Sequence, residues 1–348
     1  MTDTTSIPMT HLSIVSTLMD FLAEIGGPVE SGLAAAGMPT RIIDDRRGYV
    51  PCRTFCHWVA REGRREGLEN FGLQSVMRAG VGGLQSVVVD KVTASPTLYD
   101  GLHAFCELAY RESSNVSIWI DEGCDQIRLG HRGSFPRSVA GQPEMGWWAV
   151  GMLVQIARLF TGADWTPRMM AVPSQGSGTA SAMDMFPGAR FISHPEVVWI
   201  AIPRRDLSRP AVRGRGRFRS QACADSATPP ADPIDSLAEL IELYLPDGAP
   251  RIDQAAEIAG TSVRTFQRDL SARQLTWSKL VSNVRFETAR RLLDRSDMTV
   301  TEIAPQLGYS DSAHFARAFR RVAGVSPGAY RRDAGAGDVP SSTSMSTS

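Results

Sequence analysis

A helix-turn-helix pattern that occurs twice in the C-terminal third is the feature that most constrains this chain. In each copy, apolar residues at i, i+3, i+4 and i+7 are followed by a glycine, and the two sets lie 48 positions apart. They are Ile252, Ala255, Ala256, Ala259 and Gly260 in the first copy and Val300, Ile303, Ala304, Leu307 and Gly308 in the second. This spacing predicts a short amphipathic helix that ends in a tight turn. The repeat therefore predicts two small helical units of one design.

After each turn, a phenylalanine marks the buried face of a second helix. Phe266 has this place in the first copy and Phe315 in the second, 49 positions later, so the second turn is one residue longer. Ser262 and Asp311 each lie four positions before the phenylalanine. A side-chain oxygen there can accept a hydrogen bond from the first-turn amides, so both residues are predicted N-caps.

Several residues modify this pattern. Thr299 and Glu302 form a T-x-x-E capping box, which predicts the start of the first helix of the second copy. Pro305 falls inside that helix and predicts a kink, because proline has no amide hydrogen to donate to the carbonyl of Thr301. Gln274 lies at the turn that follows the first copy, so this turn requires either a negative φ or a strained residue.

A single long helix is predicted between the two copies. Its apolar positions have helical periodicity, while arginines fill most of the opposite face. The apolar residues are Trp277, Leu280, Val281, Val284, Ala289, Leu292 and Leu293. From Trp277 to Arg295 such a helix spans about 28 Å at 1.5 Å per residue. Successive major-groove faces on one side of B-DNA are roughly 34 Å apart, so one chain could reach two of them.

The residues of this region resemble the signature of the AraC/XylS family of transcription regulators. The matching positions are Ala289, Arg290, Arg291, Leu292, Leu293, Thr299, Val300, Glu302, Ile303, Ala304, Leu307, Gly308, Tyr309, Phe315, Arg317, Phe319, Arg320, Arg321, Gly324, Ser326, Pro327, Tyr330 and Arg331. In that family, base-reading residues lie two positions before the core phenylalanine and one and two positions after it. The resemblance therefore implies these candidate DNA-binding residues: Arg264, Gln267 and Arg268 in the first copy, and Ser312, Ala313, Ala316 and Arg317 in the second.

The chemistry of these candidates differs between the two copies. Arginine can bond both O6 and N7 of guanine, and glutamine can bond N6 and N7 of adenine, so Arg264, Gln267 and Arg268 favour base reading. In the second copy only Ser312 and Arg317 can hydrogen-bond a base edge. We expect that copy to serve orientation and phosphate contact more than sequence choice.

Charge is distributed unevenly along a chain whose formal net charge is zero. Residues 260–332 contain thirteen Lys and Arg against six Asp and Glu, a surplus of seven positive charges. The rest of the chain must then carry seven negative charges. This asymmetry is typical of a DNA-facing module joined to a neutral or acidic domain, although solvated helix faces could also produce it.

Composition and local patterns divide the chain into four segments. Residues 1–207 are predicted to be an α+β domain for effector sensing and dimerisation, and residues 208–233 a linker rich in arginine, glycine, serine and proline. Residues 234–332 are predicted to be an all-α domain of two helix-turn-helix motifs, at about 252–273 and 299–323, with the connecting helix at about 276–295. The segment 333–348 is expected to be a disordered tail.

The first domain mixes predicted helices and strands. Helices are expected at 11–25, 51–66, 68–78, 95–110, with Ser95 as N-cap and Pro96 first, and 143–160. Strands are expected at 116–121 and 126–131 as a hairpin, and at 168–172, 190–192 and 197–202. The segment 86–92 is ambiguous, and its valine run favours a strand by propensity. The order of these elements resembles the arabinose-binding-type N-terminal domain of one branch of the AraC/XylS family, which implies a small-molecule sensor.

Residue patterns give little support to an enzyme. Cys52, Cys56 and His57 lack a second ligand pair for a metal, and the helical spacing of the two cysteines favours core thiols. The Gly80, Gly82 and Gly83 cluster lacks the surroundings of a dinucleotide site. We expect no catalytic residue, metal or cofactor. Five tryptophans could line a ligand pocket, but each is expected to be core packing: Trp119, Trp147, Trp148, Trp165 and Trp199.

The function expected from these patterns is regulation of transcription by an activator. Its expected partners are double-stranded promoter DNA, RNA polymerase, an unidentified small-molecule effector and a second copy of the chain in a homodimer. With no apolar run of membrane-spanning length and no signal peptide, a cytoplasmic location without membrane contact is expected. Two alternatives stay open: a constitutive DNA binder whose first domain only dimerises, and an enzyme with an appended DNA-binding module.

Overall fold

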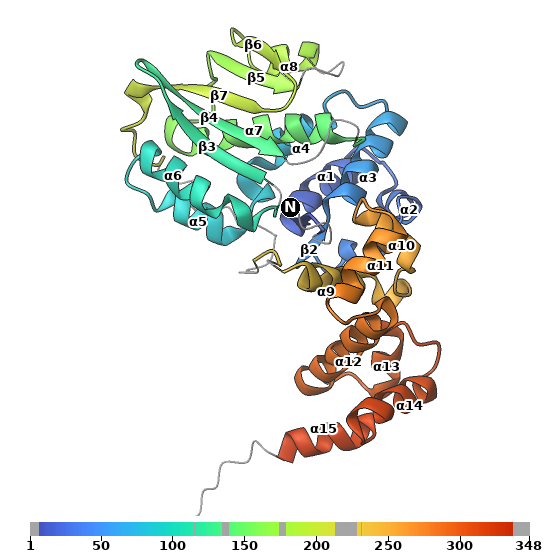
Figure 1. Ribbon diagram of the computed structural model, residues 1–348. Coiled ribbons are helices and arrows are strands. Elements are labelled where there is room, and N and C mark those ends of the chain that lie inside the picture. Colours follow the sequence, from blue (N-terminus) through green and yellow to red (C-terminus); the bar gives the residue numbers. More distant parts are fainter. Residues whose placement is uncertain are drawn as a thin grey trace, which may run out of the picture. The chain divides into compact units, whose positions relative to one another are not determined.

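The computed structural model describes residues 7–114, 116–133, 139–173, 179–212, 228–230 and 232–336. These residues form two compact units, with the boundary between Ser236 and Leu237. The front unit contains both β-sheets, and the rear unit is entirely helical over its described residues (Figure 1). The α+β and all-α classes predicted for the two parts of the chain are confirmed.

The front unit is built on a five-stranded sheet. Its strand order is β3, β4, β7, β5, β6, and only the β5–β6 pair is parallel. The strands are β3 Val116–Glu122, β4 Gln126–Gly133, β5 Met169–Pro173, β6 Arg190–His194 and β7 Val198–Pro203. Strands β3 and β4 form the predicted hairpin, with Ile120 paired to Leu129.

Helix α7, Gln142–Thr161, packs against one face of this sheet (Figure 1). Its side chains are buried nearly all round, and those of Val150 and Val154 are fully excluded from solvent. On β4, alternate side chains share one face of the sheet, and Ile127 and Leu129 are fully buried there. The main core of the front unit therefore lies between α7 and the sheet.

Further helices and a small sheet complete the front unit. They are β1 Met9–His11, α1 Leu12–Glu24, α2 Val29–Ala35, β2 Tyr49–Pro51, α3 Cys52–Arg65, α4 Phe71–Ala79, α5 Ser86–Thr93, α6 Leu98–Leu108 and α8 Thr179–Met185. Strands β1 and β2 pair in antiparallel register. The cluster of Gly80, Gly82 and Gly83 forms a short 3₁₀ helix, Gly80–Gly83.

The strand favoured for residues 86–92 is wrong, because this segment is helix α5. Val88, Val89 and Val92 lie on one side of the helix and are buried, the first and third completely. Packing of this valine face against the unit outweighs the intrinsic preference of β-branched residues for strands.

The predicted N-cap of the next helix is also wrong. Thr97, not Ser95, precedes α6, and its hydroxyl accepts a hydrogen bond from the amide of Asp100 at 3.3 Å. The Ser95 hydroxyl instead donates to the carbonyl of Lys91 at 3.1 Å, at the end of α5. Ser95 therefore belongs to the end of one helix, and Pro96 lies between the two.

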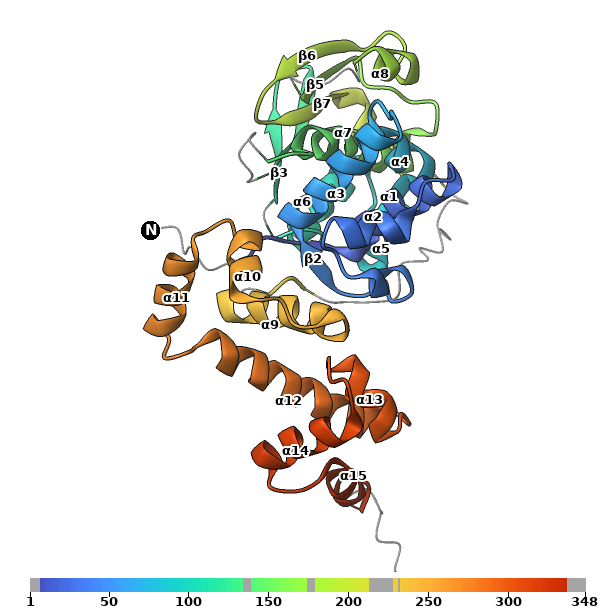
Figure 2. The ribbon, with the colours of Figure 1, turned by 90° about the vertical axis from the view of Figure 1, so that its right-hand side faces the viewer.

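The rear unit consists of seven α-helices over its described residues, and Figure 2 shows α12 running between the two helix pairs. They are α9 Pro233–Tyr244, α10 Ile252–Ile258, α11 Val263–Ala272, α12 Trp277–Arg295, α13 Val300–Gln306, α14 Ser312–Ala323 and α15 Pro327–Ala336. The helices at 252–273, 276–295 and 299–323 thus form where the repeat predicted them. Helix α9 has no counterpart in the sequence predictions.

Local details of the two motifs agree with the capping predictions. The Ser262 hydroxyl accepts from the amide of Thr265 at 3.2 Å, and Thr299 and Glu302 form a reciprocal capping box. Helix α13 continues through Pro305 without interruption. Gln274 has a φ of +58°, so the turn is made in the left-handed region and strains a residue with a side chain.

The segments at the edges of the predicted domains are only partly described. Backbone hydrogen bonds tie Leu207 and Arg209 to the start of α6, within the segment where the linker was predicted to begin. Most of that linker, 213–227 together with 231, lies outside the described residues. Helix α15 continues to Ala336, into the predicted tail, and 337–348 lie outside the described residues.

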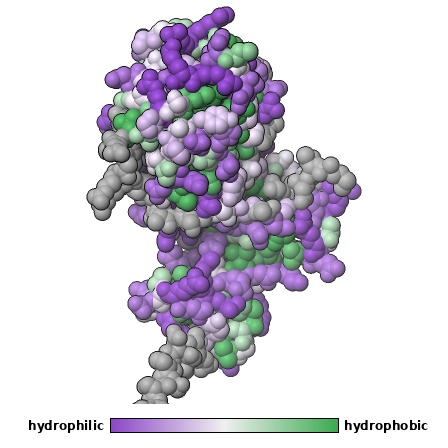
Figure 3. Space-filling model, turned by 90° about the vertical axis from the view of Figure 1, so that its left-hand side faces the viewer, coloured by the Kyte–Doolittle hydropathy of each residue, from purple (hydrophilic) through white to green (hydrophobic). Residues whose placement is uncertain are grey.

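Hydrophilic side chains dominate the face of the molecule in Figure 3, with hydrophobic ones gathered in small areas between them. Few large apolar side chains of the described segments are exposed, and Val322 and Val325 at the end of α14 are among them. The apolar residues of both units are therefore mostly internal.

Candidate nucleic-acid interface

Helix α11 presents three of the predicted DNA-binding side chains on one exposed face. Phe266 and Leu270 are buried and fix the inner side of the helix, and the ring of Phe266 packs 5.6 Å from that of Trp277. Arg264, Gln267 and Arg268, at i, i+3 and i+4, are exposed on the outer side. The helix thus places two guanidinium groups and one amide side by side toward solvent.

The arginine side chains on this face remain largely available to contact a partner, despite one ion pair. Arg268 lies 3.3 Å from the carboxylate of its neighbour Asp269, but its side chain is 72% exposed. This exposed pair contributes little to stability, so DNA could displace it at small cost. Within the described segments, Arg264 makes no hydrogen bond or ion pair.

Helix α14 divides the four predicted residues of the second motif. Phe315 and Phe319 are buried, and Ala313 and Arg317 are exposed on the opposite side. Ser312 and Ala316 are half-buried at the edge of that exposed face. The structure therefore brings Ala313 and Arg317 together at the surface, and places Ser312 and Ala316 less favourably for contact with a base.

Arg320 is a candidate that the sequence reasoning missed. It is exposed and follows Arg317 by three positions, so the two guanidinium groups share one face of α14. The corresponding position in α11 is Ser271, which is exposed but whose hydroxyl donates to the carbonyl of Gln267 at 2.8 Å. A search for exposed i, i+3 partners of Arg317 would have found Arg320. The second motif is therefore more basic than its four predicted positions indicated, because Arg317 is the charged residue among those four.

Arg285 connects the long helix α12 to the second motif. Its Nε donates to the carbonyl of Leu307 at 3.1 Å, and its guanidinium lies 5.3 Å from the centre of the Tyr309 ring. Leu307 ends α13 and Tyr309 begins the turn toward α14. A charged hydrogen bond and a cation–π contact therefore hold this turn against α12.

Three other arginines counted in the positive surplus also stabilise the fold. Arg290 donates to the hydroxyl of Tyr330 at 3.1 Å, and Arg331 donates to the carbonyl of Leu293 at 3.1 Å. Arg291 forms an ion pair with Glu242 of α9. These groups join α12 to its neighbours, so only part of the surplus is directed toward a partner.

The cysteines of α3 do not form a reactive site. Cys52 and Cys56 are both buried, and burial raises the pKa of the Cys56 thiol to about 12 and that of Cys52 above its usual range. Thiols with such pKa values are not nucleophilic at neutral pH.

Within the described ranges, no group of three His, Cys, Asp or Glu side chains could hold a metal ion. No helix of the described part is long and apolar enough to cross a membrane.

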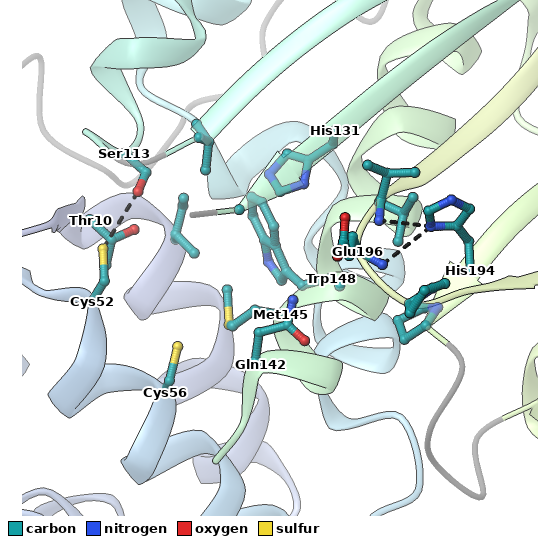
Figure 4. A pocket seen from close by; sticks show the side chains of 18 residues that line it. Thr10, Cys52, Cys56, Ser113, His131, Gln142, Met145, Trp148, His194 and Glu196 are labelled. Atoms are coloured by element: carbon teal, nitrogen blue, oxygen red, sulfur yellow. Dashed lines mark hydrogen bonds between the residues drawn. The ribbon is translucent and has the colours of Figure 1, made fainter. Parts of the chain in front are cut away.

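A cavity of about 90 Å³ is a second candidate site, and it lies in the front unit. Figure 4 shows Trp148 of α7 and His131 of β4 near its centre, with Cys56 on one side and His194 and Glu196 on the other. Trp148, expected to be core packing, is buried and also lines this space. Sequence patterns marked no residue of this cavity as an effector site.

Comparison with known families identifies the rear unit. Residues 255–333, which include both exposed helix faces, match a family described as a helix-turn-helix domain. The chain is 33% identical to the transcriptional activator NphR of a Rhodococcus species over 100 residues, 29% of this chain and 30% of that protein. It is 30% identical to the ornithine utilization regulator of Pseudomonas aeruginosa over 139 residues, 38% of this chain and 41% of that protein. Over residues 255–333 the chain therefore contains an AraC-type helix-turn-helix domain.

One further relative is similar over nearly its whole length. The HTH-type transcriptional regulator VirS of Mycobacterium tuberculosis is 23% identical over 319 residues, 90% of this chain and 93% of that protein. By contrast, the chain spans only 30% and 41% of the lengths of NphR and the ornithine utilization regulator.

Proposed function

We propose that this protein is a sequence-specific DNA-binding regulator of transcription. In this proposal residues 234–332 form the DNA-binding domain and residues 1–207 the sensor. One observation carries the proposal: two helices of matching design, α11 and α14, each expose a basic face and are joined by the helix α12. Recognition helices of helix-turn-helix domains enter the major groove in this way.

The two exposed faces would make different contributions to binding. Arg264, Gln267 and Arg268 carry donors suited to base edges, so α11 would determine most of the sequence preference. Arg317 and Arg320 of α14 would contact phosphates beside the small Ala313, which allows close approach to the backbone. A helix of the length of α12, about 28 Å, would hold the two readers on neighbouring groove segments.

We further propose that a small molecule bound to the front unit controls this activity, and that the protein is an activator acting with RNA polymerase on a promoter. The cavity beside His131 supports the first part, because ligand sites are concave and mostly apolar with a few polar groups. The second part rests on the resemblance to regulators such as NphR. A homodimer would place two such chains on neighbouring half-sites.

Footprinting with the full chain tests DNA binding. We expect two protected major-groove segments about one helical turn apart, and an affinity that falls with salt in proportion to the phosphate contacts. Arg264→Ala should weaken protection of one segment. Arg190→Ala removes an exposed positive charge from β6 of the front unit and serves as the matched control, which should leave the footprint unchanged. Binding without salt dependence, or equal losses in both variants, would contradict the proposal.

A further inference from the structure

A second, smaller hollow adjoins the cavity of the front unit. The two share five lining residues: Ile14, Ser113, Val116, His131 and Trp148. Because the same side chains form a wall of both, the hollows are neighbours and extend from Glu196 at the surface to Glu112 in the interior. Their joint volume is several times the roughly 10–15 Å³ that one water molecule requires, so a small organic molecule can enter.

Besides the indole of Trp148, His131 and Ser113 are the polar side chains that both hollows share, and the hydroxyl of Ser113 already donates to the carbonyl of Met9 at 3.2 Å. His131 follows Ile127 and Leu129 in the inward-facing row of β4 and, unlike them, is only partly buried. Desolvation lowers the pKa of its imidazole to about 4, so the ring is neutral at physiological pH, with one nitrogen a donor and the other an acceptor. The ring hydrogen-bonds to the backbone of His131 itself, and no other side chain in the described parts of the chain hydrogen-bonds to it. The second ring nitrogen can therefore hydrogen-bond to a water molecule or a ligand in the hollows.

The charges around the two hollows argue against an ionic ligand. Among the described residues that line them there is no lysine or arginine. Glu196 is exposed at the surface, where water solvates it. The carboxylate of Glu112 already accepts hydrogen bonds from the amide of Gln85 at 2.8 Å and the hydroxyl of Ser13 at 3.1 Å. An anion would meet no counter-charge here, and a cation would find the interior carboxylate occupied.

The remaining walls are mostly apolar and adaptable, and Thr10, Gln142 and His194 are further polar side chains that line the larger hollow. Trp148 provides an aromatic surface, and its indole N–H is directed at the hydroxyl of Thr17 at 3.4 Å, so that donor already has a partner. Met145 lines the larger hollow and Met152 the smaller one. Methionine side chains conform to ligands of varied shape.

We propose that these hollows form one site for an uncharged, largely apolar small molecule whose hydroxyl or carbonyl group hydrogen-bonds to His131. This inference rests on the proposed function, because it assigns a chemical class to the effector of that regulator. The apolar part of the ligand lies against Trp148 and the methionines, and the imidazole fixes its polar end.

A series of probes that differ only in charge tests this assignment on the full chain. The probes are hexan-1-ol, hexanoate and hexylammonium at neutral pH, and binding is measured by thermal shift and tryptophan fluorescence. We expect hexan-1-ol to raise the melting temperature and to bind about tenfold more tightly than either ion. Equal or tighter binding of an ion, or no binding of the alcohol, overturns the proposal.

Variants locate the site. His131→Leu removes the hydrogen-bonding group, and Val116→Phe fills space where the hollows meet, so each should weaken hexan-1-ol binding by about tenfold. His57→Leu is the matched control, since His57 is exposed on α3 and lines neither hollow. Wild-type affinity in both cavity variants would overturn the assignment, and Val116→Phe remains informative if His131→Leu does not fold.

Footprinting of the same preparations separates this inference from the proposed function. A normal salt-dependent footprint without alcohol binding would overturn only the ligand class. Alcohol binding without a footprint would overturn the DNA-binding proposal and leave the site in place.

Discussion

The buried carboxyl group of Glu112 predicts how the stability of the front unit depends on pH. Its carboxylate is buried, and desolvation raises its pKa from the ordinary 4.5 to about 7, although hydrogen bonds from Gln85 and Ser13 oppose this rise. The folded state therefore holds the proton up to about pH 7, whereas the unfolded chain releases it near pH 4.5. The contribution of Glu112 to stability should be highest below pH 4.5, fall as pH rises toward 7 and then level off. The gap corresponds to about 3 kcal/mol at 1.36 kcal/mol per pH unit.

The substitution Glu112→Gln removes this titration while it keeps the hydrogen bonds. The amide oxygen can accept from Gln85 and the amide nitrogen can donate to the oxygen of Ser13, so the variant resembles the protonated acid. Its advantage over wild type in urea unfolding should be small at pH 5 and grow to about 3 kcal/mol at pH 8. Tryptophan fluorescence can report this, because six of the seven tryptophans lie before residue 237. A difference that does not depend on pH, or that shrinks as pH rises, would refute the reasoning.

Three further predictions concern the rear unit. Arg268→Ala should weaken binding to the preferred site by about 1–3 kcal/mol and relax sequence choice, whereas an equal loss on every DNA in a gel-shift series would assign Arg268 to phosphate contact. Gln274→Gly should raise the free energy of unfolding by about 0.5–1 kcal/mol, because glycine adopts a φ of +58° without strain. The matched change Ala272→Gly, inside α11, should lower it by about 1 kcal/mol, and urea unfolding with the same sign for both would contradict this account. Arg285→Met should weaken the packing of the second motif on α12 by about 1–3 kcal/mol, so unchanged amide exchange in α13 would disprove the role of this contact.

The sequence predicted α11, α13 and α14 well because they are amphipathic and have clear N-caps, whereas α9 was not predicted. For example, the roles of Ser262 as N-cap and of Phe266 as a buried residue follow from their spacing in the sequence alone. The valine run at 87–89 misled because its propensity points to a strand, while burial of Val88 and Val92 depends on packing partners distant in sequence. Secondary-structure propensity gives the wrong prediction where tertiary packing determines the conformation of a segment.

The two candidate sites also differ in how far they could be predicted from the sequence. The buried face of α11 follows from helical periodicity, and the family resemblance then implied Arg264 and Arg268 as DNA-binding residues on the other face. Arg320 matches the family signature but was missed as a DNA contact, because it lies about one turn beyond the base-reading positions that the resemblance implies. The cavity could not be predicted, because its lining combines residues as distant as Thr10 and Val198. Only the folded chain brings such residues together.

The length of α12 has a consequence for how binding sites of this protein can evolve. Each residue of a helix contributes 1.5 Å of rise and about 100° of rotation. In the proposed complex with DNA, deleting one residue from α12 would therefore turn α14 by about a quarter of a circle and direct Arg317 away from the phosphates. An insertion of four residues would nearly restore the angle but move the second reader by about 6 Å, close to two base pairs. In that complex, α12 sets both the rotation and the distance between the two reading helices. A change in its length therefore alters both together.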